Sequence, residues 1–253
     1  MNSTSPGIIR IGTSGIVLPG AKSSFPEEFR SGSRLHYYSS LFNTLEINSS
    51  FYKIPLPATF EKWATEVRDN FKFTVKLWRG ITHAKKLDYT LADIDFFMHA
   101  ANNLGNKSGC LLLQFPASIT SEYEKKVEAI LQRLDQLNEN AQWQLAIELR
   151  HTSWYKNYFY SLLDQYKASL VLHDMPASKT PIDYQPTQFF YFRFHGPTGN
   201  YKGSYTTEFI QKYANRINIC SQVGKDVYVY FNNTMEGALT NAQLLQKLIY
   251  KGR

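Results

Sequence analysis

The sequence predicts an α/β fold of the (β/α)8 TIM-barrel type, with eight parallel strands. Three observations lead to this prediction. The chain contains eight short runs rich in β-branched and aromatic residues, helical patterns lie between most of them, and no linker or repeat divides its 253 residues. Strands that alternate with helices form parallel sheets, and eight strands can close a barrel. We therefore expect one TIM-barrel domain over residues 1–253, with residues 1–7 as a disordered tail.

The eight candidate strands share a form, an apolar run that ends in polar residues. They cover residues 7–15, 44–52, 71–78, 109–116, 143–151, 168–176, 189–197 and 226–234. Amphipathic helical patterns follow several of them, at residues 57–67, 121–137, 206–224 and 241–252. The link after the sixth strand contains Pro181 and Pro186. Because proline interrupts helices, the helix after strand six is expected to be short or missing.

Composition narrows the class of protein. No apolar run approaches the roughly 18 residues that a membrane helix needs, so no membrane partner is expected. The first residues, MNSTSPG, lack the features of a signal peptide, and Cys110 and Cys220 form no metal or disulfide pattern, which together favour a cytoplasmic location. The net charge of +7 is compatible with anionic partners, but the positive residues are dispersed rather than gathered in a tract.

The alternation of strand residues predicts which side chains face the barrel interior. In residues 145–150, Leu145, Ile147 and Leu149 share one face. These large aliphatic side chains should pack against the outer helices, so Glu148 and Arg150 should point inward. The same test on the other strands places further residues inside, namely Glu46, Asn48, Thr74, Lys76, Trp78, Gln114, Tyr191, Arg193, His195, Tyr228, Tyr230 and Asn232. For the sixth strand the pattern leaves two alternatives, His173 or Asp174.

These inward groups lie toward the carboxyl ends of the strands, where barrel enzymes carry their active sites. A buried unpaired charge costs several kcal/mol, by an order-of-magnitude estimate, so the set must pair, hydrate or contact a ligand. We expect four catalytic residues, Glu46, Glu148, Asp174 and His195. Glu148 fits a general acid or base and, alternatively, a counter-ion for Arg150 or Arg193. His195 fits proton transfer, although a single histidine is more often structural.

The expected substrate-binding residues combine cations, amides and aromatic rings. Arg193, Arg150 and Lys76 fit the binding of an anion, with an internal ion pair as the alternative for Lys76. The other expected binding residues are Asn48, Tyr52, Gln114, Trp154, Gly196, Tyr201, Tyr230 and Asn232. Phe51 is a further aromatic candidate at the mouth, the hydroxyl of Ser14 could contact a ligand, and Trp154 fits equally well as a space-filling residue.

Seven segments in order resemble the signature segments of the YecE-like family. They are IGTSG, FNTLEINSSFYKIP, FKFTVKLWRGITH, LLLQFP, LAIELRHTSW, YFRFHGP and VYVYFNNTMEGALTNA, and the resemblance runs from about Ile8 to Leu248. It implies a barrel fold and supplies no reaction, because the family is named only as a domain of unknown function. One departure is Ile16, which stands where similar members usually carry an aromatic residue.

Two classes of function follow from these residues. The first is an enzyme without a cofactor that uses acid/base chemistry on a small anionic or phosphorylated molecule, by hydrolysis, isomerisation or elimination. The second is a nucleic-acid-binding or nucleic-acid-processing barrel that uses the positive net charge and the aromatic rim.

A divalent metal site is the alternative to acid/base chemistry by side chains alone. Glu148, Asp174 and His195 end consecutive strands, in an order similar to the metal ligands of the barrel superfamily of sugar isomerases and abasic-site endonucleases. Two features argue against it. Asn232 occupies the eighth-strand position where a carboxylate would be expected, and Arg150 and Arg193 would crowd a cation.

Overall fold

The computed structural model describes residues 5–138, 142–181 and 184–250, and all of its paired strands run parallel. One sheet has the order β1-β9-β8-β7 and the other the order β2-β3-β4-β5-β6. The first contains β1 (Ile9–Thr13), β9 (Val227–Phe231), β8 (Phe190–Phe194) and β7 (Leu172–His173). The second contains β2 (Thr44–Ile47), β3 (Lys72–Lys76), β4 (Ser108–Phe115), β5 (Gln144–Leu149) and β6 (Ser169–Leu170). The predicted α/β fold with parallel strands is confirmed.

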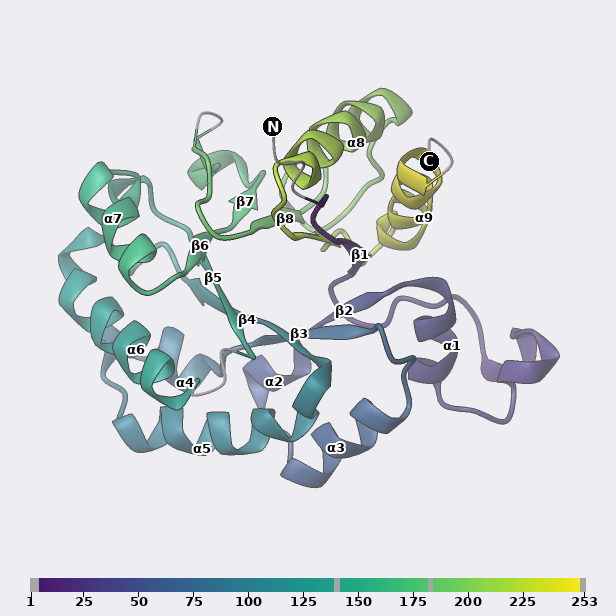
Figure 1. Ribbon diagram of the computed structural model, residues 1–253, viewed down its shortest axis with the longest axis horizontal. Coiled ribbons are helices and arrows are strands. Elements are labelled where there is room, and N and C mark those ends of the chain that lie inside the picture. Colours follow the sequence, from purple (N-terminus) through teal and green to yellow (C-terminus); the bar gives the residue numbers. More distant parts are fainter. Residues whose placement is uncertain (1–4, 139–141, 182–183, 251–253) are drawn as a thin grey trace.

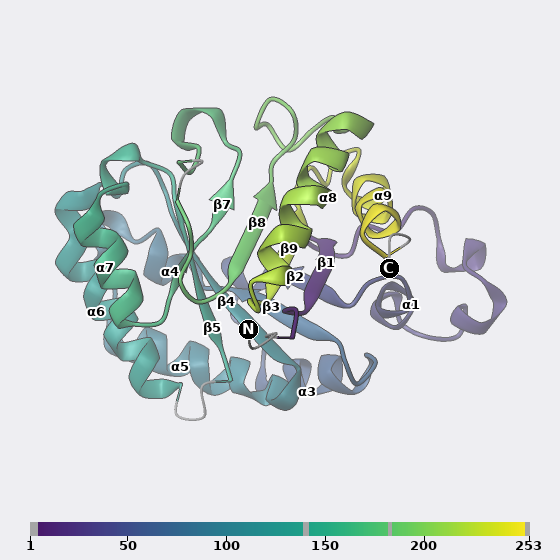
Figure 2. The same ribbon diagram turned by 45° about the horizontal axis from the view of Figure 1, so that its top comes forward.

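Helices surround the strands, as Figures 1 and 2 show. The longer helices are α1 (Arg34–Leu41), α3 (Pro57–Thr65), α5 (Leu91–Ala101), α6 (Glu124–Leu137), α7 (Asn157–Gln165), α8 (Thr207–Gln222) and α9 (Ala238–Tyr250). Two single-turn helices, α2 (Ser49–Tyr52) and α4 (Arg79–Thr82), come soon after β2 and β3. Between β7 and β8, the described residues form only the 3-10 turn Pro176–Ser178, as the prolines of this link predicted.

The expected sixth strand is split, which corrects the prediction of eight continuous strands. Its first half, β6, pairs with β5, whereas its second half, β7, pairs with β8. Thr180, in the link that folds back over this strand, supplies the reason. Its hydroxyl donates to the carbonyl of Val171 over 2.7 Å and accepts from the amide of His173 over 3.2 Å. The Thr180 hydroxyl thus bonds to a carbonyl and an amide that a continuous β-ladder would use. Because these two groups are taken, the ladder is interrupted here and the strands form two sheets.

The other boundary between the sheets lies between β1 and β2, and a side chain also joins them there. The amide group of Asn43 accepts from Ile11 N and donates to Ile9 O, each over 3.0 Å. Farther along, Gly15 N donates to Glu46 O over 2.8 Å. The two strands approach so closely at Gly12 that a Cβ there would lie 2.2 Å from Thr44 O, so only glycine fits.

The predicted faces of the strands are confirmed by the packing. Residues such as Leu145, Ile147 and Leu149 belong to the large hydrophobic cluster that includes the helices. A second, smaller cluster fills the space on the opposite face of the strands, with Cys110, Leu112, Ala146, Val171, Phe189, Tyr191, Tyr228 and Tyr230.

At the amino end, residues 1–4 of the expected tail lie outside the described residues, and Gly7 bonds through both N and O to Ser221.

Candidate functional site

A cavity of about 370 Å³ opens at the carboxyl ends of the strands and the loops that follow them. Seven of its lining residues were expected from the sequence as site residues, namely Asn48, Tyr52, Lys76, Gln114, Arg193, Tyr201 and Asn232. They come from β3, β4, β8 and the segments after β2, β8 and β9, so distant parts of the chain converge here. Its volume matches the lower end of small-molecule pockets.

Arg193 is the centre of a buried ion-pair network beside this cavity. Its Nη2 donates to Glu46 Oε1 over 2.9 Å, and its Nη1 donates to Glu148 Oε2 over 3.1 Å. Burial opposes ionisation of both carboxyl groups. The charge of Arg193 nevertheless keeps the pKa of Glu46 below its ordinary range, and the charges of Arg150 and Arg193 keep the pKa of Glu148 well below it. Tyr191 adds a hydrogen bond of 2.6 Å to Glu46 Oε2. Both carboxylates are therefore satisfied by protein groups.

The protonation state of His195 follows from its neighbours. Arg193 Nη1 and Arg150 Nη2 lie 2.9 and 3.0 Å from its Nε2. Guanidinium nitrogens only donate, so Nε2 must accept and carries no proton. The proton then resides on Nδ1, which lies 3.2 Å from Asp174 Oδ1. Burial lowers the pKa of His195, against the opposing influence of Glu148, so the ring is neutral.

Asp174 holds His195 rather than facing the cavity. Its Oδ1 also accepts from the backbone N of His195 over 2.8 Å, and its Oδ2 accepts from the hydroxyl of Tyr205. His173 is likewise engaged, because its Nε2 lies 3.0 Å from Leu149 O. Of the two alternatives for the sixth strand, Asp174 contacts the charged network and His173 packs against the ring of His195, 5.9 Å between centroids.

Lys76 is the cation that lines the cavity without a carboxylate partner among the described residues. Its Nζ donates to Gln114 Oε1 over 2.8 Å and lies 4.0 Å from the centroid of the Phe51 ring. Its side chain is buried at the end of β3. Burial, reinforced by the positive charge of Arg193, lowers the pKa of Lys76 to about 7. The lysine therefore changes charge near neutral pH.

Neutral polar groups complete the lining. Asn48 Oδ1 is buried and has no hydrogen-bond partner among the described residues. Ser14 Oγ is also buried, and its side chain interacts with Glu46, whose pKa it helps to lower. Asn232 contributes a further side-chain amide. Buried polar atoms are usually paired, so unpaired atoms in a cavity wall mark positions where a ligand or water can bond.

Four of the expected binding residues do not line this cavity, which corrects those expectations. Arg150 bonds instead to Glu148 through Nε and to His195 through Nη2. Trp154 is fully buried in the core, where its Nε1 donates to Ile119 O over 2.8 Å. Tyr230 lies deeper in the interior, with its hydroxyl bonded to Thr44 and Thr74. Gly196 adopts a φ of 93° and donates to the hydroxyl of Tyr205, so it shapes the loop after β8. Each satisfies internal bonds instead of facing the opening.

Three lining residues were not among the main expected binding residues: Ser14, Phe51 and Thr234. Ser14 and Phe51 were secondary candidates in the sequence, whereas Thr234 was missed. A signal for Thr234 existed, because it lies two positions after Asn232, and alternate residues of an extended segment share a face.

The geometry does not support the alternative metal site at Glu148, Asp174 and His195. The residues come together, but His195 lies between the two carboxylates, and Arg150 and Arg193 occupy its Nε2 side. Two guanidinium groups repel a cation at that position. Within residues 5–138, 142–181 and 184–250, no group of three or more His, Cys, Asp or Glu side chains is arranged to hold a metal ion.

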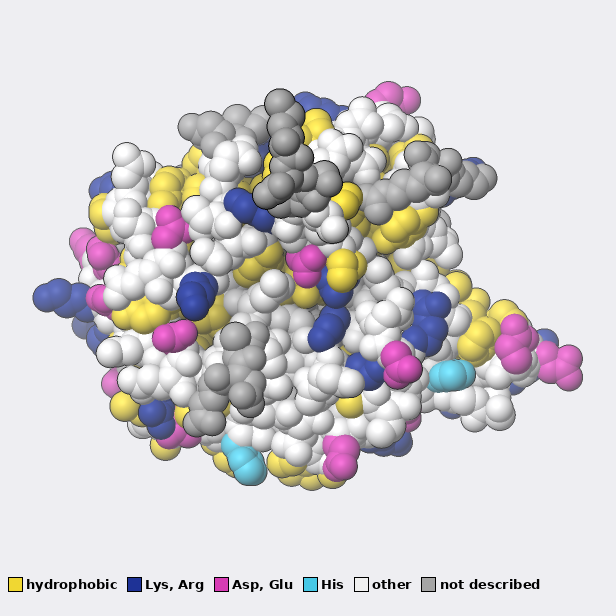
Figure 3. Space-filling view, in the orientation of Figure 1, with side chains coloured by type: hydrophobic (Ala, Val, Ile, Leu, Met, Phe, Trp, Pro, Cys, Tyr) yellow, Lys and Arg dark blue, Asp and Glu magenta, His cyan; other side chains and the backbone are white. Residues whose placement is uncertain are grey.

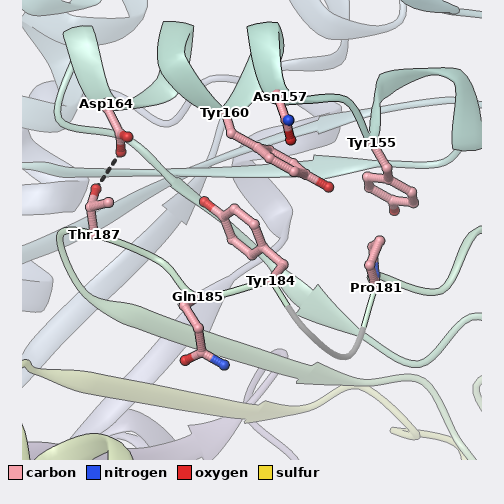
Figure 4. A pocket seen from close by; sticks show the side chains of 8 residues that line it. All are labelled: Tyr155, Asn157, Tyr160, Asp164, Pro181, Tyr184, Gln185 and Thr187. Carbon is pink, nitrogen blue, oxygen red and sulfur yellow. Dashed lines mark hydrogen bonds between the residues drawn. The ribbon is translucent and has the colours of Figure 1, made fainter.

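A second cavity, of about 470 Å³, lies between α7 and the segment before β8 (Figure 4). Tyr155, Tyr160 and Tyr184 surround it. Its charged residue, Asp164, accepts a hydrogen bond from Thr187 across the rim, as the dashed line in Figure 4 shows. The cavity lacks the converging cations of the first, so the cavity at the strand ends is the better candidate.

The surface adds two observations. On the face drawn in Figure 3, lysine and arginine side chains are scattered among acidic and uncharged ones and form no continuous basic patch. No helix in the described part of the chain is long and apolar enough to cross a lipid bilayer.

Comparisons with known proteins show relatives along almost the whole chain. The curated protein YunF of Bacillus subtilis (strain 168), a UPF0759 protein, is 26% identical over 266 residues and 90% of each chain. YecE of Escherichia coli (strain K12) is 26% identical over 52% of this chain and 47% of its own length.

Solved structures show the same fold. A DUF72 family protein of Enterococcus faecalis V583 (EF0366) superposes with a TM-score of 0.78 at 25% identity, with 96% of each chain covered. A DUF72 family protein of Thermotoga maritima MSB8 (TM1631) gives a TM-score of 0.74 at 24% identity, over 96% of this chain and 99% of its own. The sequence pattern of the family described as "Protein of unknown function DUF72" matches residues 10–252. These matches confirm the resemblance to YecE, and the chain belongs to the DUF72 family.

Proposed function

We propose that this protein is an enzyme that binds a small anionic molecule in the 370 Å³ cavity and acts on it by acid/base chemistry. The observation that carries the proposal is Lys76, a buried cavity-lining amine with no carboxylate partner among the described residues. An anion would supply the missing partner, because an opposite charge favours the charged form of a buried amine.

The cavity walls favour a small, hydroxyl-bearing anion such as a sugar phosphate or a sugar acid. Asn48, Ser14 and Asn232 offer amide and hydroxyl groups around Lys76. Tyr52 and Tyr201 stand at the rim, with 69% and 39% of their surfaces exposed, so their rings can contact the less polar part of such a molecule. Cationic groups surrounded by several neutral bonding groups are typical of sites that bind small polar metabolites.

Arg193 contributes to anion binding although it is paired. A guanidinium has five N–H donors, and Glu46, Glu148 and His195 use four of them if each contact takes one donor. The remaining N–H, on Nη2, belongs to a side chain that lines the cavity. Glu46 and Glu148 fix the guanidinium plane, so the arginine is held in place before a ligand arrives.

The proposal revises the expected division of roles. Glu46, Glu148, Asp174 and His195 act as positioning residues, because their polar atoms bond to arginine or to one another. Lys76 becomes the candidate acid or base, since a group whose pKa lies near 7 exchanges protons well at neutral pH. Hydrolysis, isomerisation and elimination all need such a group.

The proposal also takes the two sheets as halves of one closed TIM barrel in a single domain. The Asn43 contacts join β1 to β2, and on the other side Ser169 Oγ donates to Phe189 O over 2.8 Å beside β6 and β8. The cavity would then lie at the carboxyl-terminal face, the usual position of active sites in this fold.

Calorimetric titration with inorganic phosphate tests the proposal. Wild type should bind with a Kd in the millimolar range or tighter, and Lys76→Met should weaken binding at least about tenfold, the equivalent of one charge-assisted hydrogen bond. Lys72→Met is the matched control, because Lys72 is at the opposite end of β3 and its Nζ donates to Asn106 O. Equal binding by all three proteins would overturn the proposal.

A nucleic-acid ligand is the outcome that would replace it. Retention of single-stranded DNA on a filter, weakening steeply with salt and insensitive to Lys76→Met, would place the function on the outer surface instead.

A further inference from the structure

The nucleophilic capacity of Lys76 distinguishes it from the other cations beside the cavity. Arg193 and Arg150 are fixed by carboxylates and remain charged, whereas Lys76 has only the neutral acceptor Gln114 and the ring of Phe51. A lysine in its neutral form has a lone pair that can attack an electrophilic carbon. Lys76 is only 8% exposed and lines the cavity, so a bound molecule would contact the amine away from bulk water.

We propose that Lys76 is a covalent nucleophile that forms an imine with the carbonyl group of a small anionic oxo compound, such as a 2-oxo acid or a phosphorylated sugar in its open-chain form. This inference rests on the proposed function and adds to it the reacting group of the substrate. The anionic part of the compound would bind near Arg193, and its carbonyl carbon would lie at Lys76 Nζ.

The step balances without an oxidant or a reductant. The nitrogen lone pair forms the carbon–nitrogen bond, and the carbonyl π electrons move to oxygen, which takes up the proton released by nitrogen. The carbinolamine then accepts one proton on its hydroxyl, loses water and becomes an iminium ion. One amine, one carbonyl and one proton therefore give one iminium ion and one water molecule, and the reverse reaction releases the carbonyl compound.

Hydrogen bonds around Lys76 fix the direction of its amine. Gln114 Oε1 accepts from Lys76, so the amide nitrogen of Gln114 faces His83 Nε2 at 3.5 Å and donates to it. His83 Nδ1 in turn lies 2.9 Å from the hydroxyl of Thr82. Burial, together with the charge of Lys76, lowers the pKa of His83 to about 4, so His83 is uncharged at neutral pH. The hydrogen bond to Gln114 uses one N–H of the Lys76 amine and leaves its lone pair free.

The cavity also contains a hydrogen-bond acceptor for the hydroxyl group into which the carbonyl oxygen is converted. Asn48 Oδ1 is buried without a partner among the described residues and belongs to the same lining as Lys76. An acceptor in that position can bind the hydroxyl of a carbinolamine, which a ground-state carbonyl lacks. The acceptor that would bind a substrate hydroxyl in simple anion binding can thus also bind the carbinolamine hydroxyl in the imine pathway.

The experiment uses glyoxylate as the probe, with cyanoborohydride to reduce any imine to a stable secondary amine. At pH 7 we expect Lys76 in the wild-type protein to gain a carboxymethyl group at least about tenfold faster than Lys72, because burial lowers the pKa of both amines but lowers that of Lys76 farther. Peptide mass spectrometry locates and counts the modification. Inorganic phosphate should slow the labelling of Lys76 and leave that of Lys72 unchanged.

Lys76→Arg separates this inference from the proposed function, because arginine keeps the charge and forms no imine under these conditions. If wild type and Lys76→Arg both bind phosphate but Lys76 is labelled no faster than Lys72, the imine inference is overturned and the proposed function stands. If phosphate does not bind and Lys76 is not labelled preferentially, both are overturned. Preferential labelling that phosphate suppresses supports both.

Discussion

Arg193 Nη1 donates a hydrogen bond of 2.9 Å to Nε2 of His195, which comes two positions later, just after the end of β8. Their shared face follows from strand alternation, but the consequence is chemical. The donor removes His195 Nε2 from reaction with a ligand, and Asp174 Oδ1 accepts a hydrogen bond from the protonated Nδ1. The sequence favoured His195 as a group that transfers protons, but the ring is neutral and is held by hydrogen bonds between Asp174 and the two arginines.

The first prediction concerns this tautomer. His195 should remain neutral, with its proton on Nδ1, at pH values below the ordinary histidine range, because burial and the two arginines disfavour a second proton. Nitrogen-15 NMR of the imidazole groups measures this directly. Exposed His36 provides the internal comparison. A protonated Nε2 in His195 at pH 7 would contradict the arrangement.

The second prediction concerns the role of Glu148. Glu148→Gln should destabilise the fold by about 3–5 kcal/mol, because it leaves Arg150 and Arg193 with too little negative charge in a buried site. Chemical denaturation measures the free energy of unfolding. Asp95→Asn, which removes a surface partner of Arg133, should change it little. An unchanged stability in Glu148→Gln would show that the carboxylate is not needed as a counter-ion.

The ion pairs of Glu148 should also make the stability of the fold depend on pH. The pKa of Glu148 in the folded protein lies well below 4.5, so its stabilising contribution is present above the ordinary glutamate pKa and is lost as the pH falls through the folded value. The wild type should therefore lose stability below pH 4.5, and Glu148→Gln should lose less over the same interval. Denaturation curves at several acidic pH values compare the two slopes.

The third prediction is a pH dependence of anion binding. The pKa of Lys76 is about 7, so below that value the amine is charged and above it the amine is mostly neutral. Sulfate, whose own charge is constant in this range, should bind more weakly as the pH rises, by up to about tenfold per unit above pH 7. Lys76→Arg should show a flat profile between pH 6 and 9. A falling profile in that variant would assign the effect to another group.

The fourth prediction tests the boundary between β1 and β2. Asn43→Ala removes the acceptor of Ile11 N, while Ile9 O keeps the hydroxyl of Tyr250 as a partner. One buried backbone amide is left unpaired, which should cost about 1–3 kcal/mol. Asn103→Ala, whose side chain bonds to the exposed end of α5, should cost less. Equal effects of the two substitutions on the denaturation midpoint would contradict this role of Asn43.

The interior of the strands was largely predictable from the sequence. Alternation along residues 145–150 placed Glu148 inward, and the same rule placed Lys76 and Gln114, because a strand residue's face depends only on its parity. The split of the sixth strand was not predictable. It depends on the hydroxyl of Thr180, which returns to Val171 and His173 from a link whose path no local pattern determines.

The roles within the site divide in the same way. The sequence by itself determined the parallel α/β fold, the polar character of the strand ends and five residues of the cavity, because these follow from the periodicity of each strand. Tyr52 and Tyr201 were expected from their aromatic character alone. Only the tertiary structure decided the pairing. Arg193 meets Glu46 and Glu148 from three different strands, and that leaves Lys76 as the lining cation without a carboxylate among the described residues. Pairing depends on distances across strands, which periodicity along a strand does not contain.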